Sequence, residues 1–339
     1  MKWLFYFIIF FCFINVKAQT NSSIQVNGVT RDFVYYTPSS WTTNQELPLL
    51  VVMHGLTQTG NGIMNITGFN SIAEDNNFIV CYPDGINNSF NANMNITVSS
   101  ADDFGFLEAL VTYFETNFST NQYKRYLCGF STGGFMSHKM ACESSLCFAA
   151  IATVSGNMSD TVYNNCFPSF STSILHIHGT SDPVVSYNGS ASSGVSVDAS
   201  IEKWQSHLGC SLTPQITPMP DNNLFDFSNP EKHVYLGCNS SLELIKIIGG
   251  GHQWPGIPTL IGGLGNINMD FYSPEIIWEF LNGKSCPELI NNVLETQLKK
   301  EKKIIKIVDL MGRETKLKNN TFQILLFDDG SVEKVFSIQ

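Results

Sequence analysis

The chain has 339 residues, of which 43% are hydrophobic and 14% are charged, and its formal net charge is −10. This length and apolar content suffice for one large domain with a closed core. A strongly acidic chain repels phosphate, so the charge argues against a nucleic-acid-binding protein and against strongly anionic substrates.

The first eighteen residues have the features of a secretory signal peptide. Lys2 is followed by an apolar stretch from Trp3 to Val16, which is too short to span a bilayer comfortably. Val16 and Ala18 are small residues at the positions that a signal peptidase reads. We therefore expect residues 1–18 to be removed and the mature protein to be secreted, with no stable membrane span. A retained membrane anchor is the alternative.

Apolar runs alternate with helical patterns through the middle of the chain. The sequence predicts strands near residues 47–53, 78–82, 124–129, 147–154, 171–178 and 242–248. It predicts helices near residues 101–118, 133–143, 196–208 and 273–282. This alternation favours an α/β fold, with a mainly parallel sheet covered by helices on both faces.

A nucleophile elbow is predicted at Gly129-Phe130-Ser131-Thr132-Gly133. An apolar run precedes it and a helical pattern follows it, which is the strand, sharp turn and helix context that an exposed serine nucleophile requires. Ser131 would be the nucleophile, and the backbone N–H of Thr132 would donate to the oxyanion. A second donor is expected at Leu56, in the loop that follows the strand ending at Met53. A glycine-rich turn without chemistry is the alternative.

The partners of such a serine are expected downstream in the order acid, then histidine. Asp182 lies in a tight loop after a predicted strand, and His252 lies in the glycine-rich loop after another. A carboxylate can fix the tautomer of an imidazole, and histidine is the natural base near neutral pH. Asp182 as a simple turn former and His233 as a rival base are the alternatives. No third ligand stands near the His176-Ile177-His178 pair, so neither a metal nor a cofactor is expected.

Two aromatic residues near these motifs, Phe90 and Trp254, are candidates for the wall of a substrate pocket, as is Tyr187. Core packing explains each of them equally well.

The strings HGLTQTG, YPDG, DDFGFLEALV, GFSTGGFMSHKMAC, HIHGTSDPVVSYNG and GGGHQWPG occur in this order between residues 25 and 285. In them the chain resembles the polyhydroxybutyrate depolymerase family of esterases, which also holds feruloyl and acetylxylan esterases. The resemblance implies an α/β-hydrolase fold, a Ser131, Asp182 and His252 triad, and oxyanion donors at Leu56 and Thr132. The family often has Cys at the position of Leu56 and Trp at that of Phe90. The first departure removes a possible disulfide, and the second alters a pocket wall.

Nine cysteines minus Cys12 of the signal leave eight in the mature chain. An even number in an exported protein indicates disulfides. Cys210 and Cys238 are the pair expected first, whereas Cys81 and Cys128 lie in apolar strands and are candidates for free buried thiols.

The composition changes after Cys286. Residues 19–286 hold 8 Lys+Arg and 21 Asp+Glu, whereas residues 287–339 hold 9 and 8. We therefore expect a catalytic domain over 19–286 and a separate module of three short strands over 287–339. At IVDLMGRE and FDDGSVEK the module resembles the C-terminal sorting domain of the type IX secretion system, which implies contact with secretion machinery, followed by cleavage or attachment to the cell surface. A small β-appendage that packs on the enzyme is the alternative.

Together these features predict a secreted serine carboxylic ester hydrolase that acts through an acyl-enzyme. Its expected substrates are 3-hydroxybutyrate-type polyester oligomers, or feruloyl or acetyl esters of plant polysaccharide. A non-catalytic protein that binds a polymer or a surface, and a secreted serine peptidase, are the alternatives.

Overall fold

The computed structural model describes residues 19–95, 99–258, 264–287, 304–316, 321–328, 330 and 332–336. The chain divides into two compact units, Met1–Pro287 and Glu288–Gln339. The predicted signal peptide, residues 1–18, lies outside the described residues. Within the described residues, none of the helices combines the length and the apolar character that crossing a bilayer requires.

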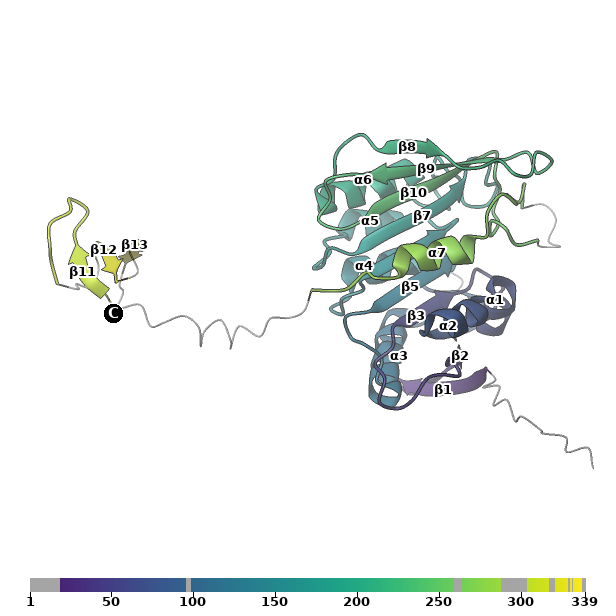
Figure 1. The fold of residues 1–339 in the computed structure, drawn as a ribbon, viewed down its shortest axis with the longest axis horizontal. Helices are drawn as coiled ribbons and strands as arrows, with labels where there is room; N and C mark the ends of the chain where they lie inside the picture. Colours follow the sequence, from purple (N-terminus) through teal and green to yellow (C-terminus); the bar gives the residue numbers. More distant parts are fainter. Residues whose placement is uncertain are drawn as a thin grey trace, which may run out of the picture. The chain divides into compact units, whose positions relative to one another are not determined.

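The larger unit is built on a ten-stranded sheet whose six central strands are parallel (Figure 1). In sheet order the central strands are β4 (Ile79–Pro83), β3 (Leu49–Met53), β5 (Arg125–Phe130), β6 (Ala150–Val154), β7 (Ser173–Gly179) and β10 (Leu242–Ile248). Antiparallel strands extend both edges: β2 (Val29–Tyr36) and β1 (Thr20–Val26) beside β4, and β9 (Asn229–Tyr235) and β8 (Gln215–Pro218) beside β10. The expected mainly parallel α/β sheet is confirmed, and the four flanking strands are additions to it.

Helices cover both faces of this sheet, as expected (Figure 1). One face packs against α1 (Gly60–Thr67), α2 (Phe69–Asn76) and α7 (Ser273–Leu281). The other packs against α3 (Asp103–Phe118), α4 (Thr132–Glu143), α5 (Asp160–Asn165) and α6 (Val197–Leu208). A short 3-10 helix, η1 (Ile86–Asn88), follows β4.

The central strands are mostly apolar because both faces of the sheet are covered there. In β3, Val51 packs into the core under α3, α4 and α6, and its neighbour Val52 packs into the core under α1, α2 and α7. Successive side chains of a strand point to opposite faces, so a strand between two helical layers needs a continuous apolar run. This is why the sequence predicts these strands well.

The smaller unit contains a three-stranded antiparallel sheet in the order β11-β12-β13. The strands are β11 (Ile304–Val308), β12 (Phe322–Phe327) and β13 (Val332–Phe336). The expected small β-module is thus present.

Three disulfides form within the larger unit: Cys142–Cys166, Cys147–Cys286 and Cys210–Cys238. The pair expected first, Cys210 with Cys238, is confirmed. Cys81 and Cys128 are free and buried, as their place in apolar strands suggested.

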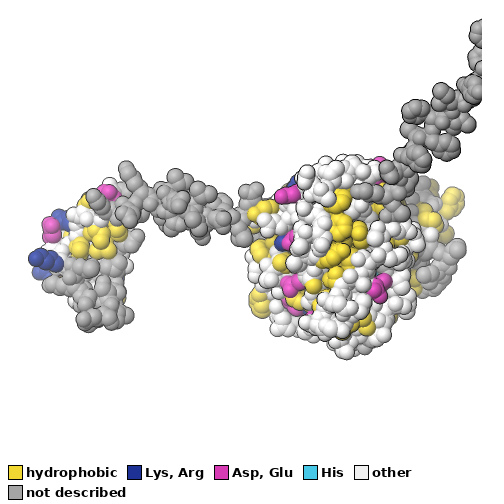
Figure 2. All heavy atoms as spheres, turned by 90° about the horizontal axis from the view of Figure 1, so that it is seen from below, with side chains coloured by type: hydrophobic (Ala, Val, Ile, Leu, Met, Phe, Trp, Pro, Cys, Tyr) yellow, Lys and Arg dark blue, Asp and Glu magenta, His cyan; other side chains and the backbone are white. Residues whose placement is uncertain are grey.

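The surface of the larger unit is more acidic than basic. On the face that Figure 2 shows, Asp and Glu side chains are seen in several places and Lys and Arg side chains in few. This agrees with the 21 acidic and 8 basic residues between positions 19 and 286. A surface of this sign favours uncharged over anionic ligands.

Removal of the Cys147–Cys286 bridge is expected to destabilise the larger unit more than removal of the Cys142–Cys166 bridge. The bridged residues are 139 and 24 positions apart, and the entropy that a crosslink removes from the unfolded chain grows with loop length. We expect the double Ser variants to lose about 5 and about 3.5 kcal/mol of unfolding free energy, respectively. Denaturant titration measures both losses, and an inverted order would contradict this explanation.

Candidate active site

Ser131 lies on the sharp turn between β5 and α4, as the sequence predicts. Its backbone has φ 52° and ψ −118°, a conformation that residues with a Cβ rarely adopt. Two hydrogen bonds hold the turn: the Ser131 N–H donates to Val154 O at 2.9 Å, and the Phe135 N–H donates to Ser131 O at 3.0 Å. The strained turn presents the serine side chain at the end of the sheet, as a nucleophile elbow does.

The glycines on either side of this turn allow the backbones to pack closely. A Cβ at Gly129 would lie 2.1 Å from Gly133 O, and a Cβ at Gly133 would lie 2.4 Å from Met53 O. One at Gly156, after β6, would lie 2.6 Å from Ser131 O. No side chain fits at these distances, so the elbow requires glycine for steric reasons.

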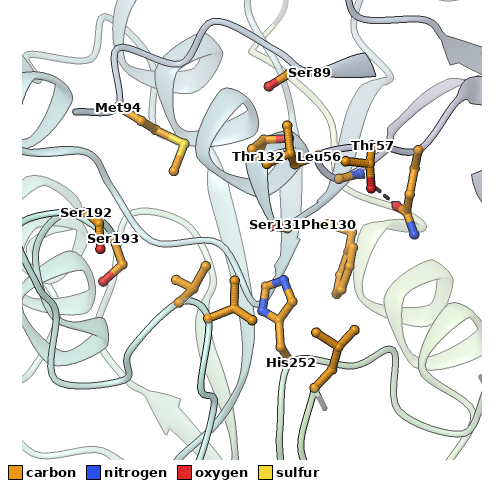
Figure 3. Close-up of a pocket in the computed structure, with 15 residues that line it drawn as sticks. Leu56, Thr57, Ser89, Met94, Phe130, Ser131, Thr132, Ser192, Ser193 and His252 are labelled. Carbon is orange, nitrogen blue, oxygen red and sulfur yellow. Dashed lines mark hydrogen bonds between the residues drawn. The ribbon is translucent and has the colours of Figure 1, made fainter. Parts of the chain in front are cut away.

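Asp182 and His252 meet at the ends of two neighbouring strands. Asp182 follows β7, and His252 follows the parallel strand β10. His252 Nδ1 lies 2.8 Å from Asp182 Oδ2. A carboxylate can only accept, so Nδ1 carries the proton and Nε2 remains free to act as a base. Figure 3 places the His252 ring beside Ser131.

The Asp182 carboxylate is buried but well supplied with donors. Oδ1 accepts from the backbone N–H groups of Val184 and Val185, each at 2.8 Å. Burial opposes ionisation, but hydrogen bonds from His178 and His252 outweigh it and hold the pKa of Asp182 well below its usual range. The carboxylate therefore stays ionised near neutral pH and can orient His252.

The two expected oxyanion donors lie at the same place. Leu56 follows β3 and Thr132 begins α4, and both line the cavity that Ser131 lines. Within the described residues no hydrogen bond occupies the backbone N–H of either one. Thr132 is the first residue of its helix, where N–H groups have no intrahelical acceptor. Both N–H groups are thus available to a developing negative charge.

The loop that carries Leu56 is fixed by polar contacts. The ring of His54 bridges Gly55 O at 2.7 Å and the Gly85 N–H at 3.0 Å. The Gly55 N–H donates to Gln58 Oε1 at 2.9 Å, and the Thr57 N–H donates to Asn88 O at 2.9 Å. These contacts hold the loop without using the Leu56 N–H.

A cavity of about 320 Å³ opens beside Ser131 (Figure 3). Its wall is mainly apolar, and hydroxyl groups lie at some positions. The lining residues are Gly55, Leu56, Thr57, Gln58, Ser89, Met94, Phe130, Ser131, Thr132, Val184, Val185, Ser192, Ser193, His252 and Leu264. A pocket of this size and lining is typical of small-molecule sites.

The aromatic residues that the sequence suggested as pocket walls are not among these lining residues. Trp254 is buried and stacks on Phe130 with ring centroids 5.8 Å apart. Phe90 is buried against the ring of His54 at 4.7 Å. Tyr187 is buried as well, and its hydroxyl donates to Asp198 at 3.0 Å. Of these three rings, Trp254 packs on a residue that lines the cavity, Phe130.

Several lining residues carried no signal in the sequence. Met94, Ser192, Ser193 and Leu264 come from loops that lack a recognisable motif, and only the tertiary fold brings them to the cavity. An apolar residue next to a motif is the one cue the sequence offers. Val184, two residues after Asp182, is an example, and the structure leaves it exposed.

The other histidines have local roles. His176 and His178 stack on each other with ring centroids 5.3 Å apart. His233, the rival base, pairs with Glu231 at 2.8 Å on β9. Among the described residues, no group of three or more His, Cys, Asp or Glu side chains is arranged to hold a metal ion.

Comparison with known proteins gives a family match over most of the larger unit. Residues 25–215 match the model of the family described as "Putative esterase". Feruloyl esterase C of Emericella nidulans is 27% identical over 269 residues, which cover 77% of this chain and 86% of the relative. The bifunctional acetylxylan esterase/xylanase XynS20E of Neocallimastix patriciarum is 25% identical over 67% of this chain and 31% of that longer protein.

A solved structure has the same fold. The acetyl xylan esterase from Aspergillus awamori aligns with a TM-score of 0.50 over 69% of this chain and 94% of that protein. The sequence identity is 16%, so the comparison concerns the fold alone.

Gly133→Ala is expected to destabilise the larger unit, and Gly62→Ala is the matched control. Both glycines lie in the first turn of a helix. A Cβ at Gly133 meets the backbone of Met53, whereas one at Gly62 meets only the hydroxyl of Thr59 at 3.3 Å. We expect a loss of about 3 kcal/mol for Gly133→Ala from overpacking, and a change below about 1 kcal/mol for Gly62→Ala. Thermal and denaturant unfolding measure both, and equal losses would contradict the packing argument.

Proposed function

The chain belongs to the Putative esterase family and is a carboxylic ester hydrolase, and from this premise we propose that Ser131, Asp182 and His252 are its catalytic triad. The observation that carries the proposal is the hydrogen bond between His252 and Asp182, formed where His252 and the strained Ser131 line the same cavity. A nucleophile, an oriented base and two backbone donors at one cavity are the parts of an acyl-transfer site.

In the first half of the proposed reaction, Ser131 Oγ attacks the ester carbonyl carbon while His252 Nε2 accepts the hydroxyl proton. The carbonyl oxygen becomes an oxyanion, which accepts hydrogen bonds from the N–H groups of Leu56 and Thr132. Collapse of this intermediate breaks the bond to the alcohol, and His252 returns the proton to the leaving oxygen. The product is an acyl-enzyme on Ser131.

In the second half, His252 removes a proton from water, and the resulting hydroxide attacks the acyl carbon. The same donors hold the second oxyanion. Its collapse releases the carboxylic acid and returns the proton to Ser131. Asp182 remains ionised throughout and stabilises the imidazolium that forms at each step, which agrees with the strong depression of its pKa.

We propose feruloyl or acetyl esters of plant polysaccharide as the substrate class. Relatives at 25–27% identity are named feruloyl and acetylxylan esterases, which supports this class over polyester oligomers. The cavity agrees with a neutral acyl group, because its wall is mainly apolar and His252 is the single ionisable side chain among its described lining residues. Short 3-hydroxybutyrate esters remain the comparison substrate.

We also propose that the protein acts outside the cell. Disulfides persist in oxidising compartments, and the larger unit contains three of them. Residues 1–18 would direct export as a signal peptide. Residues 287–339, which include β11, β12 and β13, would engage secretion machinery as a sorting module of the type IX kind.

Ser131→Ala is expected to abolish hydrolysis of a short-chain p-nitrophenyl ester while the protein stays folded. Loss of a triad nucleophile lowers kcat by several orders of magnitude, about 10⁶-fold in a well-studied hydrolase. A fluorophosphonate probe should label the wild type and fail to label the variant. The thermal unfolding midpoint is the control for folding. Retained hydrolysis in the variant would disprove the role of Ser131.

The substrate class is tested by comparing kcat/KM for methyl ferulate, an acetylated xylo-oligosaccharide and a 3-hydroxybutyrate oligomer under one set of conditions. We expect one of the two plant-type esters to be preferred over the polyester by at least about tenfold, which corresponds to about 1.4 kcal/mol of transition-state binding. A preference for the 3-hydroxybutyrate oligomer would favour a polyester depolymerase. A preference for a peptide amide over all three would contradict an esterase.

A further inference from the structure

Two buried histidines that take no part in the proposed reaction lie directly behind Asp182. His176 and His178 are on β7, and both are fully shielded from solvent. His178 Nε2 lies 2.8 Å from Val185 O and 3.4 Å from Asp182 Oδ2. Its other nitrogen, Nδ1, lies 3.1 Å from His176 Nε2, and His176 Nδ1 lies 2.8 Å from Thr153 Oγ1. These contacts form one continuous series of hydrogen bonds from Thr153 on β6 to Asp182.

The acceptors at the end of this series determine the direction of every hydrogen bond in it. Val185 O and the Asp182 carboxylate can only accept, so His178 Nε2 must carry a proton. In a neutral ring His178 Nδ1 is then an acceptor, and His176 Nε2 must donate to it. His176 Nδ1 is left as an acceptor, which the Thr153 hydroxyl satisfies as a donor. One arrangement of protons therefore satisfies all four contacts.

A neutral His176 ring is consistent with the surroundings of this series of hydrogen bonds. Burial is the main cause that places the pKa of His176 well below its usual value. His138 stacks on His176 with ring centroids 5.7 Å apart, and burial lowers its pKa to about 3. A buried imidazolium would be costly in such an environment.

His178 holds the peptide that in turn holds Asp182. Val185 O accepts from His178, and the Val185 N–H donates to Asp182 Oδ1 at 2.8 Å. His178 also approaches the other carboxylate oxygen, Oδ2, which accepts from His252. Rotation of the Asp182 carboxylate would break these contacts, so its orientation toward His252 is fixed from both sides.

We propose that His178, kept in its Nε2–H form by His176 and Thr153, is a positioning residue that fixes the Asp182 carboxylate and the Val185 peptide for catalysis. His178 is not among the residues that line the cavity, and it acts through Asp182. The proposal rests on the proposed function in naming Asp182 as the catalytic acid.

Two amide substitutions of His178 test whether its Nε2–H donor is required. The Gln side chain places its amide nitrogen near the position of His Nε2, and the shorter Asn side chain places it near Nδ1. His178→Asn should lower kcat by about ten- to hundredfold with KM changed less than about twofold, because misplacement of the carboxylate slows the chemical step. His178→Gln should keep kcat within about threefold of wild type. Equal activity of the Asn variant and wild type, or equal loss in both variants, would overturn the proposal.

The tautomers themselves are tested in the resting wild-type enzyme. Nitrogen-15 NMR of labelled histidines should show neutral Nε2–H rings at both His176 and His178 near neutral pH. An Nδ1–H tautomer or an imidazolium at His178 would contradict the derived direction. This readout needs no catalysis and no variant, so it applies even where a substitution prevents folding.

Asp182→Asn separates this proposal from the assignment of the triad. An amide at this position offers His252 the wrong partner, so the variant should lose about 10⁴-fold in kcat. Asp226→Asn is the control, because Asp226 contacts Ser228 and Met269 and does not line the cavity. If Asp182→Asn stays active, the catalytic acid is misassigned and the proposed function fails, whatever the tautomers are. If it is inactive while His178→Asn is normal, the triad stands and the role of His178 is disproved.

Discussion

The close packing of backbones around Ser131 is the constraint on which the rest of the site depends. Its left-handed φ of 52° is unfavourable and persists only because the surrounding structure fixes it. Gly133 lies against Met53 O at the end of β3, and Gly156 lies against Ser131 itself. These contacts fix α4 at the end of the sheet, and Thr132 at its first position lines the cavity. The helix dipole adds a positive potential at that end, which favours a developing oxyanion.

The site is assembled at the carboxyl ends of parallel strands, where crossover loops emerge together. Leu56 follows β3, Ser131 follows β5, Asp182 follows β7 and His252 follows β10. The central strands were predictable because burial on both faces requires continuous apolar runs. The outer strands were not: β8 is exposed throughout, so its sequence shows neither an apolar run nor a regular alternation. Its pairing with β9 is decided by tertiary contact.

The motif residues of the proposed site could be suggested from sequence because the chemistry expected of them restricts both their neighbours and their order. Ser131 needs flanking glycines, and His252 must follow the acid along the chain. The cavity wall has no such restriction: Met94 and Ser192 need only suitable size and polarity, and many sequences satisfy that. Trp254 illustrates the converse. Its position beside a motif suggested a pocket wall, but a ring this large is as readily buried behind the wall, where it packs on Phe130.

On the side formed by Ser192 and Ser193, we expect the cavity to discriminate by shape more than by hydrogen bonding. The Ser193 hydroxyl is hydrogen-bonded to the Ser190 hydroxyl, with the two oxygens 2.7 Å apart. The Ser192 hydroxyl is hydrogen-bonded to the same Ser190 oxygen at 3.0 Å. A site rejects an analogue strongly when the loss of a ligand group leaves buried polar atoms unpaired. The hydroxyls of Ser192 and Ser193 keep Ser190 as a hydrogen-bond partner whether or not a ligand is bound. A ligand that lacks a polar group therefore leaves neither hydroxyl unpaired. On this side of the cavity we therefore expect apolar fit to decide, at about 1–3 kcal/mol per methylene.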